Sequence, residues 1–139
     1  MLKIPRRLPL LEEMAAGPKI KEWFGSSKVV DESGEPLLVW HGGKVKAGPE
    51  GGIFFTRDEQ LAAAYSKGGE LHCGFLKMDN PFIKDFSGER SYEFYDEIEE
   101  AVDGGYDGVI LMNVEDHESG KPETQYVIFS EGQLMEVER

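Results

Sequence analysis

Short apolar runs, separated by turns rich in glycine, proline and acidic residues, fill most of the chain. Runs of roughly four to eight apolar residues between turn signals are typical of buried strands. We therefore expect strands over residues 28–30, 37–40, 53–56, 70–78, 107–112, 125–129 and 134–137. In the longest of these, Leu71, Cys73 and Phe75 alternate onto one face, as the two-residue period of a strand requires.

Three further segments place apolar residues at helical spacing, over residues 18–24, 57–66 and 91–102. The first is expected to end at Gly25. In the second, Leu61, Ala64 and Tyr65 lie three and four positions apart and are expected to share one face. Thr56 is the expected N-cap of this helix, because its hydroxyl can accept a hydrogen bond from a free backbone N–H.

The third helix is expected to begin at Ser91 and to end before the Gly104-Gly105 pair. Its apolar residues Phe94, Ile98 and Val102 recur every fourth position and are expected to face the core. Strands and helices follow one another without βαβ regularity. The pattern therefore predicts an α+β fold with two small packed sheets of antiparallel or mixed strands and flanking helices.

The length of 139 residues corresponds to one domain. We expect residues 1–17, which Pro5 and Pro9 interrupt, to form an N-terminal arm, and residues 18–139 to form a single domain. No apolar stretch approaches the roughly 18 residues of a membrane span, and the N-terminus does not resemble a secretory signal. A single cysteine, Cys73, fits a reducing compartment. We expect a cytoplasmic monomer without a membrane partner.

The excess of acidic over basic residues narrows the classes of partner that the protein can bind. A formal net charge of −12 and a pI of about 4.6 oppose binding to phosphate backbones, so nucleic acid is not expected as a partner. The acidic residues are spread along the chain, which indicates a solvated surface and leaves a basic protein partner open. His72 and His117 are isolated, and no pair has zinc-ligand spacing, so no metal is expected. Phosphate-loop, dinucleotide-fold and nucleophile-elbow motifs are also missing from the sequence.

Four segments in a particular order carry the strongest chemical signal. They are Leu38-Val39-Trp40-His41-Gly42-Gly43, Gly52-Ile53-Phe54-Phe55-Thr56, Ala64-Tyr65 and Thr124-Gln125-Tyr126-Val127-Ile128-Phe129. In order and spacing the chain resembles the ADP-ribosyltransferase superfamily. The resemblance is to the diphtheria-toxin and poly(ADP-ribose) polymerase branch, of the H-Y-E type, and to compact members carried by phage and mobile-element polyproteins.

The resemblance covers about residues 18–137, since segments 21–25, 28–31, 34–37 and 105–110 are also similar to those compact members. It implies an ADP-ribosyltransferase-like fold whose two sheets form a cleft for NAD, the substrate that donates ADP-ribose. A chain of phage origin would act in the cytoplasm of the bacterial host.

The resemblance also assigns roles to residues. His41 would hydrogen-bond the adenine-side ribose of NAD, and the Gly42 backbone, next to Gly43, would bind the nicotinamide carboxamide. Phe54 and Tyr65, which lie eleven positions apart as the family requires, would sandwich the nicotinamide ring. This ring is cationic before cleavage, so aromatic faces would attract it. A hydrogen-bonded structural role is the alternative for His41, and core packing is the alternative for Tyr65.

Four positions depart from the family pattern. Gly43 stands where Ser or Thr is usual, Phe54 replaces a Tyr, and Ala62 replaces the Ser that polymerase-like members often carry. Most important for catalysis, Gln125 occupies the position of the usual catalytic Glu. A carboxylate there would stabilise the positive charge that develops on the ribose, and losing one such stabiliser costs roughly 10²–10³ in rate.

A nearby carboxylate could replace the catalytic Glu that is missing at position 125. Glu123 lies two positions before Gln125, so a strand would place both side chains on one face. Glu123 would then supply the missing charge or orient the acceptor, unless Gln125 is itself an engineered change of a natural Glu. Residues 115–118, Glu-Asp-His-Glu, are interpreted as a solvated loop, with acceptor recognition near the cleft as the alternative.

The sequence thus predicts a mono-ADP-ribosyltransferase that modifies a protein, expected to be a host protein. Extension to a polymer is not expected, because that activity depends on the Glu that Gln125 replaces. Two alternatives stay open. One is an NAD-binding or protein-interaction module with the same fold and little catalysis, and the other is an NAD glycohydrolase. The sequence does not name the acceptor or the modified residue type.

Overall fold

The computed structural model describes residues 2–4, 18–91, 93–116 and 119–137. Its elements, in chain order, are β1 (Leu2–Ile4), α2 (Pro18–Phe24), β2 (Val39–Gly42), β3 (Ile53–Thr56), α3 (Glu59–Ser66), β4 (Leu71–Leu76), β5 (Phe82–Asp85), α4 (Tyr95–Asp103), β6 (Gly108–Glu115), β7 (Pro122–Ile128), the 3₁₀ turn η1 (Glu131–Gln133) and β8 (Leu134–Val137). None of the helices among the described residues has the length and apolar character needed to cross a membrane.

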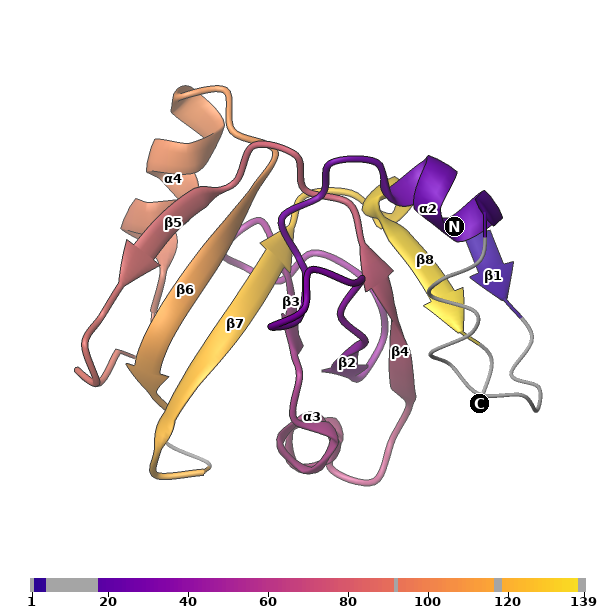
Figure 1. The fold of residues 1–139 in the computed structure, drawn as a ribbon. Coiled ribbons are helices and arrows are strands. Elements are labelled where there is room, and N and C mark those ends of the chain that lie inside the picture. The colour runs from indigo at the N-terminus through magenta and orange to yellow at the C-terminus, as the bar shows by residue number, and fades with distance from the viewer. Residues whose placement is uncertain (1, 5–17, 92, 117–118, 138–139) are drawn as a thin grey trace.

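The strands of the described part form one mixed sheet in the order β1-β8-β4-β2-β3-β7-β6-β5. β1 and β8 are parallel, as are β5 and β6, and the other neighbours are antiparallel. β2 and β3 are registered at one residue pair, Trp40 with Thr56, and the strands on either side of this joint slant in different directions (Figure 1). The predicted α+β class is confirmed. The predicted division into two sheets is not, because hydrogen bonding continues across the joint.

Three apolar clusters hold helices and loops against the sheet. At one end, α4 packs beside β5 and β6 (Figure 1), and Ile98 and Ala101 meet the buried side chains of β6 and β7. At the other end, Ile20 and Phe24 of α2 meet Met135 of β8 and its neighbours. The third cluster centres on buried side chains of β3 and β7, with further ones from β2, β4, β6 and β8, and the segment between α2 and β2 helps to cover it.

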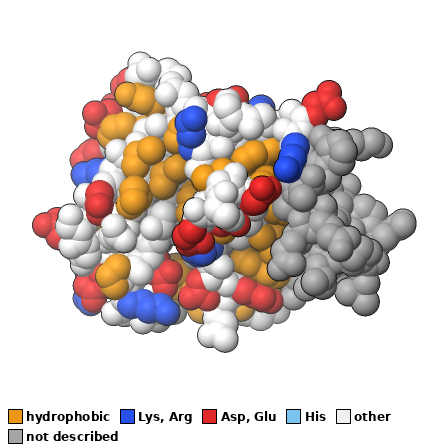
Figure 2. All heavy atoms as spheres, viewed as in Figure 1, with side chains coloured by type: hydrophobic (Ala, Val, Ile, Leu, Met, Phe, Trp, Pro, Cys, Tyr) orange, Lys and Arg blue, Asp and Glu red, His pale blue; other side chains and the backbone are white. Residues whose placement is uncertain are grey.

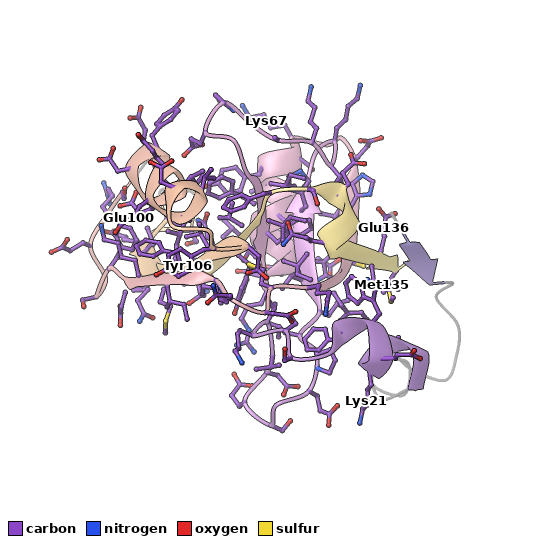
Figure 3. The ribbon with its side chains drawn as sticks, turned by 90° about the horizontal axis from the view of Figure 1, so that it is seen from above. Lys21, Lys67, Glu100, Tyr106, Met135 and Glu136 are labelled. Carbon is purple, nitrogen blue, oxygen red and sulfur yellow. The ribbon has the colours of Figure 1, made fainter. Side chains whose placement is uncertain are left out.

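The side chains of α2 confirm its predicted amphipathic pattern, with a polar face and an apolar face. Lys21 is exposed and points away from the sheet, whereas Met135 of β8 is in the apolar cluster with α2 (Figure 3). Among the residues of this helix whose side chains are described, Ile20 and Phe24, four positions apart, are buried. The helix ends where Gly25 adopts a φ of 55°, a conformation that glycine tolerates without steric cost.

α3 begins later than predicted, at Glu59, because Asp58 rather than Thr56 caps it. An Asp58 carboxylate oxygen accepts hydrogen bonds from the backbone N–H groups of Gln60 at 3.0 Å and Leu61 at 3.3 Å. Of the three residues predicted to share one face, Leu61 is buried, whereas Ala64 and Tyr65 are exposed. Leu61 and Ala62 are the buried residues of the helix, and Tyr65 is 42% exposed.

α4 also begins later than predicted, at Tyr95, with Phe94 rather than Ser91 at its N-cap. Val102, predicted to face the core, is 56% exposed. Four residues advance a helix by about 400°, so a series at every fourth position drifts about 40° per step around it. Ala101, three positions after Ile98, returns to the buried face and takes the place expected for Val102.

The predicted strands over 53–56 and 134–137 are confirmed as β3 and β8, whereas 28–30 contains only a bridge of Val30 with Pro36. β5 was not predicted, because its mostly exposed side chains show no apolar pattern. β6 and β7 extend beyond the strands predicted over 107–112 and 125–129, into the segment between them. Within the predicted arm, β1 pairs with β8, and residues 5–17 lie outside the described part of the chain.

Candidate functional site

A cavity of about 490 Å³ opens where β2 and β3 meet. Side chains and backbone of β2, β3, α3 and β7 line it, together with the loop at residues 48–50 and residues that precede α4. The lining includes five residues that the sequence assigns to one site, namely His41, Gly42, Phe54, Tyr65 and Gln125. Two other predicted site residues, Gly43 and Glu123, are not among the lining residues.

His41 is fixed by two backbone carbonyl groups. Its Nδ1 lies 2.6 Å from the Phe54 oxygen, its Nε2 lies 2.8 Å from the Lys44 oxygen, and its ring centroid is 5.3 Å from that of Phe55. A neutral imidazole has one N–H and can donate to only one of these carbonyls. Both ring nitrogens have backbone partners, as the structural alternative for His41 predicts, and the contact with Lys44 is the exposed one of the two.

The two glycines after His41 serve different purposes. A Cβ on Gly42 would lie 2.0 Å from the Ala62 carbonyl oxygen and 2.7 Å from the Ser66 nitrogen, so only glycine lets α3 approach β2 this closely. Gly43 has a φ of 93° and donates its N–H to the Glu70 carbonyl at 2.8 Å. This backbone conformation favours glycine and explains why Ser or Thr does not occupy the position.

Phe54 and Tyr65 reach the cavity from different elements. Phe54 of β3 is half-buried, and its ring centroid lies 5.9 Å from that of Phe94. Tyr65 of α3 is 42% exposed, and its hydroxyl is part-buried where it donates to Asp116. Phe55, which alternates with Phe54 on β3, is 2% exposed and belongs to the apolar cluster, and it also lines the cavity.

Asp116 is the residue of this site that sequence reasoning missed. It is 3% exposed, it lines the cavity, and its Oδ2 accepts hydrogen bonds from the Tyr65 hydroxyl at 2.8 Å and from the Gln125 Nε2 at 3.1 Å. Its backbone N–H donates to the Lys121 carbonyl at 3.1 Å, and its carbonyl accepts from the Gly120 N–H at 2.7 Å. The predicted solvated loop therefore contains a buried carboxylate. His117 and Glu118 of that loop lie outside the described residues.

A β-bulge in β6 explains why alternation along the strand did not reveal Asp116. The register with β7 shifts between Leu111 and Val114, and Asn113 between them has a φ of 54°. Before the shift, Leu111 faces the core, and after it Val114 and Asp116 do. A period of two counted from Leu111 through the bulge would assign Asp116 to the opposite face, with Ile110 and Met112.

Glu123 lies on β7 opposite Val114 and is 9% exposed. None of the described residues gives its Oε1 a hydrogen bond, and the nearest cation is the Lys121 Nζ at 4.0 Å. Burial, with a smaller effect from the charge of Asp58, raises the pKa of the Glu123 carboxyl above its ordinary value of 4.5. Its predicted part in the chemistry stays a prediction, since it does not line the cavity with Gln125.

Replacing Glu123 with glutamine is expected to stabilise the protein at neutral pH. A carboxyl whose pKa is raised in the folded state makes the folded state bind more protons, so stability falls as pH rises above about 4.5. Relieving a buried, poorly paired carboxylate should gain up to about 1 kcal/mol at pH 7. Urea unfolding of both proteins at pH 3.5, 5 and 7 checks this, and a gain that does not shrink below pH 4.5 would contradict it.

The charge of the molecule is dispersed over its surface. Acidic side chains alternate with Lys, Arg and hydrophobic side chains over the face in Figure 2, and the formal net charge is −12. Within the described residues, no group of three or more His, Cys, Asp or Glu is arranged to hold a metal ion. The cavity itself combines aromatic rings, one histidine and the amide–carboxylate pair of Gln125 and Asp116 with a second carboxylate, Glu50, and the hydroxyl-bearing residues Thr56 and Ser91.

Comparisons with protein-family models, with curated proteins and with solved structures find no match for this chain. What the cavity binds is therefore inferred from the residues around it.

Proposed function

We propose that this protein is a mono-ADP-ribosyltransferase that binds NAD in the cavity, releases nicotinamide and transfers ADP-ribose to a protein acceptor. One observation supports this most directly. His41, Gly42, Phe54, Tyr65 and Gln125 are scattered along the chain and come from three strands and a helix, yet they line one cavity. These are the residues to which the family resemblance gives contacts with NAD.

The size and lining of the cavity suit a ligand of this kind. Its volume of about 490 Å³ lies within the roughly 300–1,000 Å³ that ligand sites span. Phe54 and Tyr65 offer ring faces to the cationic nicotinamide, and the Gly42 backbone offers hydrogen bonds to its carboxamide. His41 Nε2 would exchange the Lys44 carbonyl for a ribose hydroxyl. In this proposal the bent sheet is an ADP-ribosyltransferase-like fold, and its joint forms the NAD cleft.

The reaction needs no group beyond these residues and the two substrates. The bond between the ribose carbon and the nicotinamide nitrogen breaks, and nicotinamide leaves with the electron pair. A nucleophilic side chain of the acceptor then attacks the ribose carbon and loses its proton. Clamping the nicotinamide ring holds NAD near the reactive geometry, which is the main rate contribution expected from positioning. The acceptor is a protein, expected to be a host protein of the bacterial cytoplasm, and the transferase acts as a monomer.

The test is to incubate the protein with NAD labelled in its adenylate part and with a bacterial lysate. Label on a protein band is expected with the wild type and is expected to be lost in His41→Ala. His72→Ala is the matched control, because His72 lies directly opposite His41 on β4 but does not line the cavity. Circular dichroism of both variants separates loss of activity from loss of fold.

The same experiment distinguishes the alternatives. Release of nicotinamide without labelled protein would indicate an NAD glycohydrolase. Binding of NAD by calorimetry without either product would indicate a binding module, for which the neutral Gln125 in place of a Glu is the supporting observation. If NAD does not bind at all, the proposed function is wrong. Glu123→Gln in the same assay tests whether that carboxylate takes part.

A further inference from the structure

One carboxylate oxygen joins two residues of the proposed NAD site. The Oδ2 of Asp116 accepts from the Tyr65 hydroxyl at 2.8 Å and from the Gln125 Nε2 at 3.1 Å, and all three residues line the cavity. At 3% exposure, Asp116 is shielded from bulk water, so its interactions are screened less than surface ones.

We propose that Asp116 is a positioning residue that makes Gln125 act in place of a catalytic glutamate. This inference rests on the proposed function. The Asp116 carboxylate would hold the Gln125 amide in one orientation, with its carbonyl oxygen available to the ribose, and would supply the negative charge that the amide lacks. The Tyr65 hydroxyl, bound to the same oxygen, would fix one half of the aromatic clamp to the same group.

The orientation follows from hydrogen-bonding capacity. A carboxylate accepts and an amide nitrogen donates, so Gln125 must turn its Nε2 toward Asp116. The Gln125 Oε1 is then the amide atom that does not face Asp116. The reversed amide would set a carbonyl oxygen against a carboxylate oxygen, two acceptors without a proton between them. Asp116 therefore excludes the orientation in which Gln125 would present a donor to the ribose.

The Asp116 carboxylate would act on the ribose indirectly, through its hydrogen bond with the Gln125 amide. A hydrogen bond to an ionised group is roughly twice as strong as a neutral one, and hydrogen bonds in a chain polarise one another. The Asp116 carboxylate would thus increase the negative character of the Gln125 carbonyl oxygen. Glu123 is a weaker source, because it lies outside the lining of the cavity and burial opposes its ionisation by raising its pKa.

The test exchanges the carboxylate and the amide between positions 116 and 125. Asp116→Asn removes the charge and allows the Gln125 amide to reverse, so kcat for nicotinamide release is expected to fall about 10²-fold while the KM for NAD changes less than about threefold. Gln125→Glu sets two carboxylates against each other, which forces one to take up a proton, so its rate should fall and its pH profile should shift. In Asp116→Asn/Gln125→Glu the asparagine amide can donate to the glutamate, and the rate is expected to return to within about tenfold of wild type.

A structural role alone does not explain such a rescue. The proposal is overturned if kcat of the double variant does not exceed kcat of each single variant. It is also overturned if Asp116→Asn keeps the wild-type kcat. Should Asp116→Asn fail to fold, Gln125→Met examines the same pair from its other side. Methionine has a similar length and no amide, so kcat is again expected to fall about 10²-fold with NAD binding retained. Full activity of that variant would overturn the proposal.

Thermal unfolding separates this inference from the proposed function. Asp116→Asn is expected to lower Tm by roughly 5 °C, and the double variant should recover at least half of that loss. This coupling between positions 116 and 125 needs no NAD. A wild type that cleaves no NAD but shows the coupling would count against the proposed function, whereas an active wild type without coupling in Tm or rate would count against the Asp116–Gln125 pair.

Discussion

Phe55→Ala is expected to lower the free energy of unfolding by about 3–5 kcal/mol. Phe55 is 2% exposed and lies in the apolar cluster with Ile53, Ile128 and Leu134, which come from three strands. Removing the ring would lose its transfer free energy and leave a cavity that the surrounding strands cannot close, because the sheet fixes their separation. Urea unfolding at 25 °C, with an unchanged m-value, measures the loss.

Phe54→Ala is the control for this substitution, because the two phenylalanines are neighbours on β3 that face opposite sides of the sheet. Phe54 is only half-buried, so its loss should destabilise the protein less than the loss of Phe55. It should nevertheless weaken NAD binding in calorimetry, since Phe54 belongs to the proposed clamp. A Phe55→Ala variant that loses under about 1 kcal/mol would contradict the assignment of Phe55 to the core.

Local rules predicted much of the fold, and they failed where two local signals competed. The apolar runs at 53–56 and 134–137 became strands because each faces a buried cluster. The start of α3 was misplaced because Thr56 and Asp58 are both good caps, and the choice depends on how β3 ends. The two-sheet expectation came from counting short strands. Whether such strands join depends on one pair, Trp40 with Thr56, and the strand pattern does not specify it.

The candidate site, too, was predicted from the sequence only in part. The prediction that His41, Phe54, Tyr65 and Gln125 share one site came from the family resemblance that their order and spacing carry, and the four residues do line one cavity. Asp116 follows a bulge, and a bulge reverses which face each later residue of the strand occupies. No pattern of residue types in β6 announces that reversal. The buried carboxylate could therefore be found only from the pairing of β6 with β7.

Gly42→Ala is expected to destabilise the protein by roughly 3 kcal/mol, near the upper end of the overpacking range. The new methyl group would lie 2.0 Å from the Ala62 carbonyl oxygen and 2.7 Å from the Ser66 nitrogen. Both atoms belong to the backbone of α3, so no side-chain rotation relieves the contact and the helix must move away from β2. Tyr65 is on this helix, so its hydrogen bond to Asp116 should be strained as well.

Gly48→Ala provides a matched control in the loop on the other side of the cavity. A Cβ at Gly48 would meet nothing closer than the Gly52 oxygen at 3.9 Å, and its φ lies outside the left-handed region. Its stability should therefore be unchanged or higher by up to about 1 kcal/mol, because alanine restricts the unfolded chain. Thermal unfolding and NAD calorimetry of both variants are informative together. If Gly42→Ala lowers Tm and NAD affinity while Gly48→Ala keeps the wild-type Tm, the close contact of α3 with β2 both stabilises the fold and shapes the NAD site. A Gly42→Ala variant with the wild-type Tm and a lost affinity would instead limit the role of Gly42 to its backbone contact with the ligand.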